Sequence, residues 1–395
     1  EPDPSPIESA NEEVVDTTNT RRSNRQGKGQ HSQRYGFHIS IKKALELFRD
    51  DGETAIKIEL KNMRDKQVFK PVFASSLTND QFRNILPSFM FLKEKLKPDG
   101  SRDKIKARLV AAGNHQDREV YTDTSSPTVN ITHLLIEAAI ASKLQHIVVT
   151  LDVGAAYLNA SMEEQQVFMR LDPNLTRLFI ELYPEHSRYV NPSTHTMLVQ
   201  LCKALYGCVQ SALLWYQHLK NVLINLNFTV NTYDECIFAK REGSSTCTIL
   251  VYVDDLMLIS NDQSLINQTI QQLKDEFKEV NVNYGNSHDY LGMTFEFKPN
   301  HLLITMRGYI ENILNSNKVT KHSSTPSSPD LFVIKDQVLL PPEQQKKLHT
   351  TTAQLLYLCT RTRPDLMLVV NFLTTRVNKF TKEDEMKLDK CLRYL

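Results

Sequence analysis

The chain is organised around the run Thr248-Ile-Leu-Val-Tyr-Val-Asp254-Asp255-Leu-Met-Leu-Ile-Ser260. Two adjacent carboxylates stand in the middle of a run that is otherwise apolar and rich in β-branched residues. The two arms, residues 248–253 and 256–259, predict a β-hairpin with both aspartates at its tip. The rest of the sequence is best understood by asking what this acidic tip needs around it.

Two neighbouring carboxylates in an apolar setting need a cationic partner. An ionised carboxylate is costly to bury alone, and two side by side repel each other. The nearest basic residues in the sequence are Arg241 and Lys274, so no cation is adjacent. A divalent metal ion is the expected partner, and oxygen ligands favour Mg²⁺ or Mn²⁺. The alternative is that Asp254 and Asp255 form the exposed turn of a surface hairpin, where Asp is common.

A third carboxylate ends another predicted strand. Residues 147–151 are β-branched and apolar, which predicts a buried central strand, and Asp152 follows at its C-terminal end before the turn at Gly154. Asp152 could instead cap a helix, which is a common role for Asp. If the two strands are neighbours in one sheet, three carboxylates converge, which is enough to clamp two Mg²⁺ ions.

Two basic arms flank the turn Pro98-Asp99-Gly100. Residues 89–97 and 104–111 predict a hairpin in which alternation puts the basic side chains of an arm on one face. These side chains are Lys93, Lys95 and Lys97 on the first arm and Lys104, Lys106 and Arg108 on the second. Such a face could hold phosphate groups, or it could protect an edge strand from pairing.

Composition indicates a globular intracellular protein of two or three domains. The chain has 395 residues, is 41% hydrophobic and carries a net charge of +1, which neither demands nor excludes a nucleic-acid partner. The six cysteines show no metal-ligand spacing, which predicts buried free thiols in a reducing compartment. No signal peptide and no apolar run near the ~20 residues of a membrane span is visible. The first residue is Glu1, so we expect a piece of a longer chain.

Three regions follow from composition and periodicity. Residues 1–38 are polar and charged, which predicts a disordered linker, with a nucleic-acid-binding arm as the alternative. Residues 39–320 carry the strands described above. Residues 321–395 begin with a Ser- and Pro-rich linker at 322–329, after which the pattern is helical to the end. The predicted helices are 44–48, 54–63, 131–144, 211–228, 264–277, 308–315, 352–360, 364–377 and 382–395, and residues 290–297 with 302–306 predict a second hairpin. Within 211–228, Trp215 and Tyr216 are predicted core aromatics.

Six segments, in this order, resemble the polymerase of copia-type LTR retrotransposons, and the tip of the central hairpin resembles the signature of reverse transcriptases. The hairpin tip is Tyr252-Val-Asp254-Asp255, and the segments are Lys106-Ala-Arg108-Leu-Val-Ala, Ser126-Pro127, Asp152 to Asn159, Lys203-Ala-Leu-Tyr-Gly207, Tyr290-Leu-Gly292-Met and Arg361-Thr-Arg363-Pro-Asp365. The resemblance runs from about residue 39 to 395. One departure is that Ala212 and Leu213 stand where the family often has a Pro and a basic residue.

The resemblance implies an α+β right-hand polymerase with fingers, a palm built on an antiparallel sheet, and a helical thumb at residues 321–395 that stops before a ribonuclease H region. It implies an RNA-directed DNA polymerase that uses two Mg²⁺ ions, with Mn²⁺ as a substitute. Asp152, Asp254 and Asp255 match the catalytic metal ligands, and Val153 belongs to the same metal site. The implied substrate-binding residues are Lys97, Lys106, Arg108, Tyr157, Tyr206, Gly207 and Gln210. Among these, Tyr157 matches the residue that excludes a ribose 2′-hydroxyl, and the basic residues match those that bind the triphosphate.

The implied partners are an RNA template, a primer or DNA duplex and dNTPs, with integrase and ribonuclease H supplied by the rest of a polyprotein. The implied location is a virus-like particle in the cytoplasm, or the nucleus, with no membrane association. The resemblance does not specify an oligomeric state. Two other hypotheses compete with this one. A catalytically inactive relic would bind nucleic acid without chemistry, and a purely structural protein would bind no metal ion.

Overall fold

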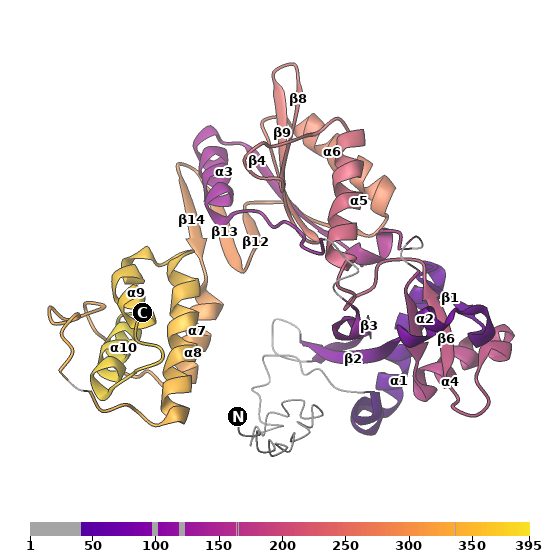
Figure 1. Ribbon diagram of the computed structural model, residues 1–395. Helices are drawn as coiled ribbons and strands as arrows, with labels where there is room; N and C mark the ends of the chain where they lie inside the picture. The colour runs from indigo at the N-terminus through magenta and orange to yellow at the C-terminus, as the bar shows by residue number, and fades with distance from the viewer. Residues whose placement is uncertain (1–40, 97–101, 118–122, 163, 165, 336) are drawn as a thin grey trace, which may run out of the picture. The chain divides into compact units, whose positions relative to one another are not determined.

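The structure is a computed structural model that describes residues 41–96, 102–117, 123–162, 164, 166–335 and 337–395 (Figure 1). The predicted disordered linker at residues 1–38 and the predicted turn at residues 98–100 lie outside the described residues. The chain divides into two compact units, Glu1–Glu59 with Met90–Arg108 and Leu60–Phe89 with Leu109–Leu395. The carboxylates belong to the second unit, and the basic arms belong to the first.

The described part of the first unit consists of most of one long helix and two strand segments. Helix α1 (Ile41–Asp65) is continuous, although the sequence pattern predicts two separate helices at 44–48 and 54–63. Gly52 lies inside the helix and is buried, as are Ala55 and Ile56, so packing overrides the low helix propensity of glycine. The strand segments belong to β2 (Leu86–Leu96) and β3 (Arg102–Ala111).

The predicted alternation of the second basic arm is confirmed. On β3, Lys104, Lys106 and Arg108 are exposed, while Ala107 and Leu109 are buried. On β2, Lys93 is exposed beside the buried Leu92. The basic side chains whose burial is described on these two strands are therefore exposed.

A six-stranded antiparallel sheet forms the centre of the second unit. Its strand order is β11-β4-β10-β9-β8-β7, with bounds Val280–Asn283, Ile147–Val153, Asp255–Ser260, Ser245–Tyr252, Ile237–Glu242 and Thr229–Val230 in that order. The predicted central hairpin is confirmed as β9 and β10, joined by the two-residue turn Val253-Asp254. Strand β10 also pairs with β4, so the two predicted acidic strands are direct neighbours.

Three helices accompany this sheet. Helices α5 (Ser211–Asn225) and α6 (Gln263–Phe277) lie together on one side of it, and α3 (Ile131–Leu144) lies on the other (Figure 1). Helix α5 buries Trp215 and Tyr216, as the sequence predicts for core aromatics. It ends three residues before the predicted limit, ahead of Asn227, which adopts a left-handed conformation (φ 65°) that a helix cannot continue through.

Two smaller sheets lie outside the six-stranded sheet. Strands β1 (Phe69–Val72), β6 (Met197–Leu201) and β5 (Phe168–Leu171) pair in this order, and the start of β2 pairs with β5 in parallel; the helices of this region are α2 (Asn79–Arg83) and α4 (Pro173–Leu182). Strands β12 (Ser287–Tyr290), β13 (Met293–Lys298) and β14 (His301–Thr305) form the third sheet. The predicted continuous strand 290–297 is wrong, because Leu291 and Gly292 have positive φ and make a tight turn between β12 and β13.

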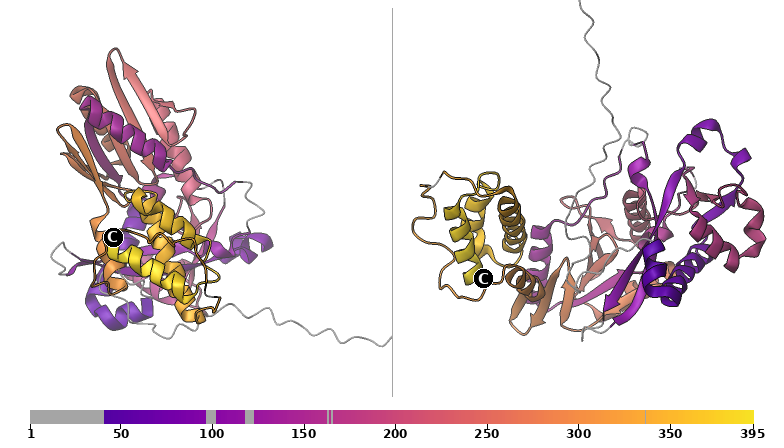
Figure 2. Two further views of the ribbon diagram at one scale, coloured as in Figure 1. Left: turned by 90° about the vertical axis from the view of Figure 1, so that its left-hand side faces the viewer. Right: turned by 90° about the horizontal axis from the view of Figure 1, so that it is seen from below.

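The C-terminal part is helical, as the sequence predicts (Figure 2). Its helices are α7 (Arg307–Ser316), α8 (Pro342–Cys359), α9 (Met367–Thr374) and α10 (Lys382–Tyr394). Helix α8 starts ten residues before the predicted residue 352, at Pro342, because proline fits the first helical position well. None of the described helices is long and apolar enough to cross a membrane. The structure is of the predicted α+β class.

A buried ion pair holds α10 to the loop before it. The guanidinium of Arg376 donates to both carboxylate oxygens of Asp384, whose side chain is 1% exposed. Removing one partner leaves a buried charge unpaired, so Arg376→Met should lower the free energy of unfolding by about 3–5 kcal/mol. Urea denaturation measures this loss.

The matched control is the exposed pair of Lys382 and Glu385 on the same helix. Lys382→Met should cost no more than about 1 kcal/mol, because an exposed pair is screened by water. Equal losses in the two variants would contradict the importance of burial.

Candidate active site

Asp152 and Asp255 are direct cross-strand partners. The register of β4 and β10 pairs Asp255 with Asp152 and Leu256 with Leu151. Paired residues on neighbouring antiparallel strands carry their side chains on the same face of the sheet, with Cβ atoms about 5 Å apart. The two carboxylates that are about a hundred residues apart in the sequence are therefore neighbours in space.

Asp254 lies in the turn beside this pair. Its carbonyl oxygen accepts a hydrogen bond of 2.9 Å from the backbone N–H of Val153, the residue after Asp152. This bond ties the turn of the central hairpin to the end of β4. The predicted metal-site residues Asp152, Val153, Asp254 and Asp255 are thus brought together.

The negative charge of the site affects the pKa of Asp255. Burial, followed by repulsion from Asp254 and Asp152, raises the pKa of the Asp255 carboxyl to about 6. A carboxyl with a pKa this high lacks adequate compensation for its negative charge. The site is therefore suited to a cation.

Asn281 is a site residue that the sequence analysis missed. It lies on β11 opposite Asp152, and its side-chain N–H₂ donates a 3.1 Å hydrogen bond to Asp152 Oδ2. This bond fixes the direction of one carboxylate without adding charge. The alternation in Val280-Asn-Val-Asn283 is the signal that could have revealed the strand.

The donor chemistry of the three aspartates fits hard divalent ions, which prefer oxygen ligands. Within the described part of the chain, however, no three His, Cys, Asp or Glu side chains are grouped closely enough to hold a metal ion as they stand. Backbone pairing brings the three aspartates together at one end of the sheet.

A second group of predicted residues gathers after β4 and before α5. The rings of Tyr157 and Tyr206 lie 4.9 Å apart. Gly207 has a φ of +93°, and a Cβ added there would lie 2.0 Å from the carbonyl oxygen of Ala111. The backbone N–H of Ala111 in turn donates a 2.9 Å bond to the carbonyl of Tyr206. The tyrosine-glycine motif is therefore a point where two backbones touch.

Gln210 is held by a residue the sequence analysis did not single out. Gln116 accepts a bond from the backbone N–H of Val209 (2.9 Å) and donates one to Gln210 Oε1 (3.0 Å). Gln210 is 3% exposed, so its side chain is buried, and the bond from Gln116 holds its amide in place. No local pattern marks Gln116, because its partners lie more than ninety residues away.

The predicted triphosphate residues lie outside the part of the chain that carries the carboxylates. Lys97 lies outside the described residues, and Lys106 and Arg108 belong to the first unit. Their assignment to the triphosphate remains a prediction.

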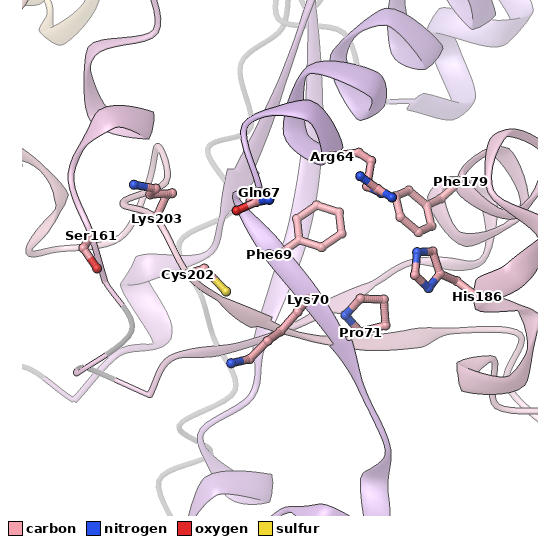
Figure 3. A pocket seen from close by; sticks show the side chains of 10 residues that line it. All are labelled: Arg64, Gln67, Phe69, Lys70, Pro71, Ser161, Phe179, His186, Cys202 and Lys203. Atoms are coloured by element: carbon pink, nitrogen blue, oxygen red, sulfur yellow. The ribbon is translucent and has the colours of Figure 1, made fainter. Parts of the chain in front are cut away.

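A separate hollow of about 540 Å³ lies beside β1 in the second unit (Figure 3). Three of the side chains around it are basic, namely Arg64, Lys70 and Lys203, and none of its described lining residues is acidic. It contains none of the predicted site residues. The remaining lining residues are Gln67, Phe69, Pro71, Ser161, Phe179, His186 and Cys202.

The raised pKa of Asp255 predicts a titration near pH 6. In the unfolded chain the pKa of an Asp carboxyl is about 4. Between these values the folded chain retains a proton that the unfolded chain has lost, so the contribution of Asp255 to stability falls as pH rises through this window. Carboxyl ¹³C NMR should show a midpoint of about 6 for Asp255. Asp152→Asn should lower this midpoint, and a wild-type midpoint of about 4 would contradict the effects of burial and repulsion described above.

The backbone contact at Gly207 predicts a large cost for any side chain. Gly207→Ala should lower the free energy of unfolding by more than about 2 kcal/mol, because both its φ and the Ala111 carbonyl oppose a Cβ. Gly243 is the control, since it also has positive φ (+61°) but nothing lies within 4 Å of an added Cβ. Gly243→Ala should cost only the conformational term of about 1–2 kcal/mol. Equal costs in denaturation experiments would argue against the close approach.

Comparison with known proteins identifies the family. The family model described as "Reverse transcriptase (RNA-dependent DNA polymerase)" matches residues 79–329, which is more than half of the chain. A retrovirus-related Pol polyprotein from transposon RE1 of Arabidopsis thaliana is 30% identical over 307 residues, covering 76% of this chain and 20% of the relative. The polyprotein from transposon TNT 1-94 of Nicotiana tabacum is 27% identical over 315 residues, covering 76% and 22%.

The chain spans about a fifth of the length of these relatives. Among solved structures, a foamy viral protease-reverse transcriptase in complex with double-stranded DNA aligns with 86% of this chain and 47% of its own, at 12% identity and a TM-score of 0.46, a likeness too loose to bear on function. The extent of the family match and the relatives agree with the resemblance of the motifs. This chain belongs to the reverse transcriptase (RNA-dependent DNA polymerase) family, in the form found in the Pol polyproteins of copia-type retrotransposons.

Proposed function

We propose that this chain is the polymerase part of a retrotransposon Pol polyprotein and that it copies an RNA template into DNA from a primer. The observation that carries the proposal is the pairing of Asp152 with Asp255, beside Asp254 in the hairpin turn. Family membership supports the reaction class. The partners are the RNA template, the primer or DNA duplex, and dNTPs.

The three aspartates would hold divalent metal ions at the end of the sheet. Two bound Mg²⁺ ions, or Mn²⁺ in their place, supply activation of the primer 3′-hydroxyl and neutralisation of the leaving pyrophosphate. The chain itself orients Asp152 through Asn281 and holds Asp254 through the backbone N–H of Val153. The uncompensated charge at Asp255 is what draws cations to this place.

Tyr157, Tyr206, Gly207 and Gln210 would form the nucleotide pocket. Tyr157 contacts Tyr206 and lies four residues after Val153, the last residue of β4. Because Asp152 is the residue before Val153, a sugar bound over Tyr157 would lie near the carboxylate site. A bulky aromatic ring below the sugar leaves no room for a 2′-hydroxyl, which favours dNTPs. Gln210, fixed by Gln116, offers its amide as the polar contact.

We assign the parts of the hand as the motifs do. Residues 39–320 would form the fingers and palm, and residues 321–395 the thumb. Lys97, Lys106 and Arg108, in the fingers, would bind the triphosphate. The matching relatives are polyproteins, so integrase and ribonuclease H would come from other parts of such a chain, in a virus-like particle in the cytoplasm or in the nucleus.

Primer extension tests the proposal. Purified protein with oligo(dT) annealed to poly(rA), dTTP and Mg²⁺ should lengthen the primer. Asp254→Asn should reduce the rate by at least about 100-fold, because the site loses a charge that its metal ions need.

The control is Asp275→Asn, which makes the same chemical change at an exposed position on α6. It should leave the rate unchanged. Extension that survives Asp254→Asn would contradict the site, and no extension by the unaltered chain would favour the inactive relic.

A further inference from the structure

Trp215 makes a hydrogen bond that core packing alone does not require. It is the only tryptophan of the chain, lies on α5 and is 1% exposed. Its indole N–H donates to the carbonyl oxygen of Val253 at 2.6 Å. Val253 is the residue immediately before Asp254, in the turn of the central hairpin.

Val253 has a backbone conformation that valine avoids. Its φ is +56°, in the left-handed region. A β-branched residue is a clear outlier there, and such strain persists only where surrounding contacts over-determine the conformation. The bond from Trp215 is one such contact.

The backbone is tied on both sides of Asp254. The carbonyl before it, that of Val253, accepts from Trp215, and its own carbonyl accepts from the N–H of Val153 at 2.9 Å. One tie comes from a helix and the other from β4. Together they fix the direction in which the Asp254 side chain leaves the turn.

We propose that Trp215 is a positioning residue for the carboxylate site, which rests on the polymerase function proposed above. The indole N–H holds the strained Val253 peptide and so aims the carboxylate of Asp254 at the place where the metal ions bind. Trp215 itself touches neither nucleotide nor template in this account. Its effect should therefore appear in metal binding and in the rate of the chemical step.

The chain provides a matched pair of variants. The ring of Trp215 packs against Phe277 at 5.3 Å, so Trp215→Phe retains much of the packing and removes the N–H. Tyr216, the next residue on α5, is 6% exposed, and its hydroxyl donates to the backbone carbonyl of Glu235 at 2.9 Å. Tyr216→Phe therefore also removes one buried bond to a backbone carbonyl, but at a place outside the catalytic turn.

The two variants are compared in primer extension and in Mn²⁺ binding followed by electron paramagnetic resonance. Trp215→Phe should lower kcat by about 10-fold with little change in KM for dTTP, and weaken Mn²⁺ binding by about 5-fold, which is the scale of one lost hydrogen bond. Tyr216→Phe should lower the melting temperature about as much as Trp215→Phe does, because each variant loses one hydrogen bond. It should leave kcat and Mn²⁺ binding at wild-type values. Equal kinetic and Mn²⁺ effects in the two variants, or wild-type values in Trp215→Phe, would overturn the proposal.

The single tryptophan also provides a readout that needs neither activity nor a folded Trp215 variant. Titrating Mn²⁺ into the wild-type chain should quench its tryptophan fluorescence, and Asp254→Asn should abolish the quenching. A tryptophan fluorescence intensity that does not change on addition of Mn²⁺ would overturn the proposal. A wild-type chain that quenches with Mn²⁺ but extends no primer would refute the polymerase function and leave the positioning role supported.

Discussion

The antiparallel pairing of β4 with β10 is the interaction on which the rest of this structure depends. It places Asp152 and Asp255 opposite each other on neighbouring strands, with their side chains on the same face of the sheet, although two carboxylates repel. Burial, together with repulsion from Asp254 and then from Asp152, raises the pKa of the Asp255 carboxyl to about 6. A sheet can hold such a pair only if the rest of its residues bury enough apolar surface to keep the register, because slipping by one residue would turn every side chain to the other face.

The surrounding elements serve this register. Strand β10 buries Leu256, Met257 and Leu258 completely, and the neighbouring β9 buries Ile249 and Leu250 in the same way. The phenol of Tyr290, from β12, donates to the carbonyl of Leu250 at 2.9 Å and so braces the central hairpin from a different sheet. Polar groups near the carboxylates are thus supplied from three directions: β11 through Asn281, α5 through Trp215 and β12 through Tyr290.

Sequence reasoning reached the parts of the site that local pattern encodes. Alternation and apolar runs predicted the β9–β10 hairpin and the strand that ends at Asp152, because burial on a pleated sheet demands those patterns. It missed Gln116 and Asn281, whose partners lie 94 and 129 residues away, since no periodicity records such a pairing. Trp215 was predicted correctly as a core residue, but its N–H has a partner that only the folded turn presents. The turn at Leu291-Gly292 was missed because Leu rarely signals positive φ.

Hydroxyl-radical cleavage tests the central claim, that segments distant in the sequence form one metal site. Fe²⁺ replaces Mg²⁺ in the folded chain, and ascorbate with peroxide then cuts the backbone near the bound ion. We expect cuts in three clusters at once, around residues 152–154, 253–255 and 280–282, all suppressed by excess Mg²⁺. Cuts confined to one of these segments, or cuts that Mg²⁺ does not suppress, would contradict it.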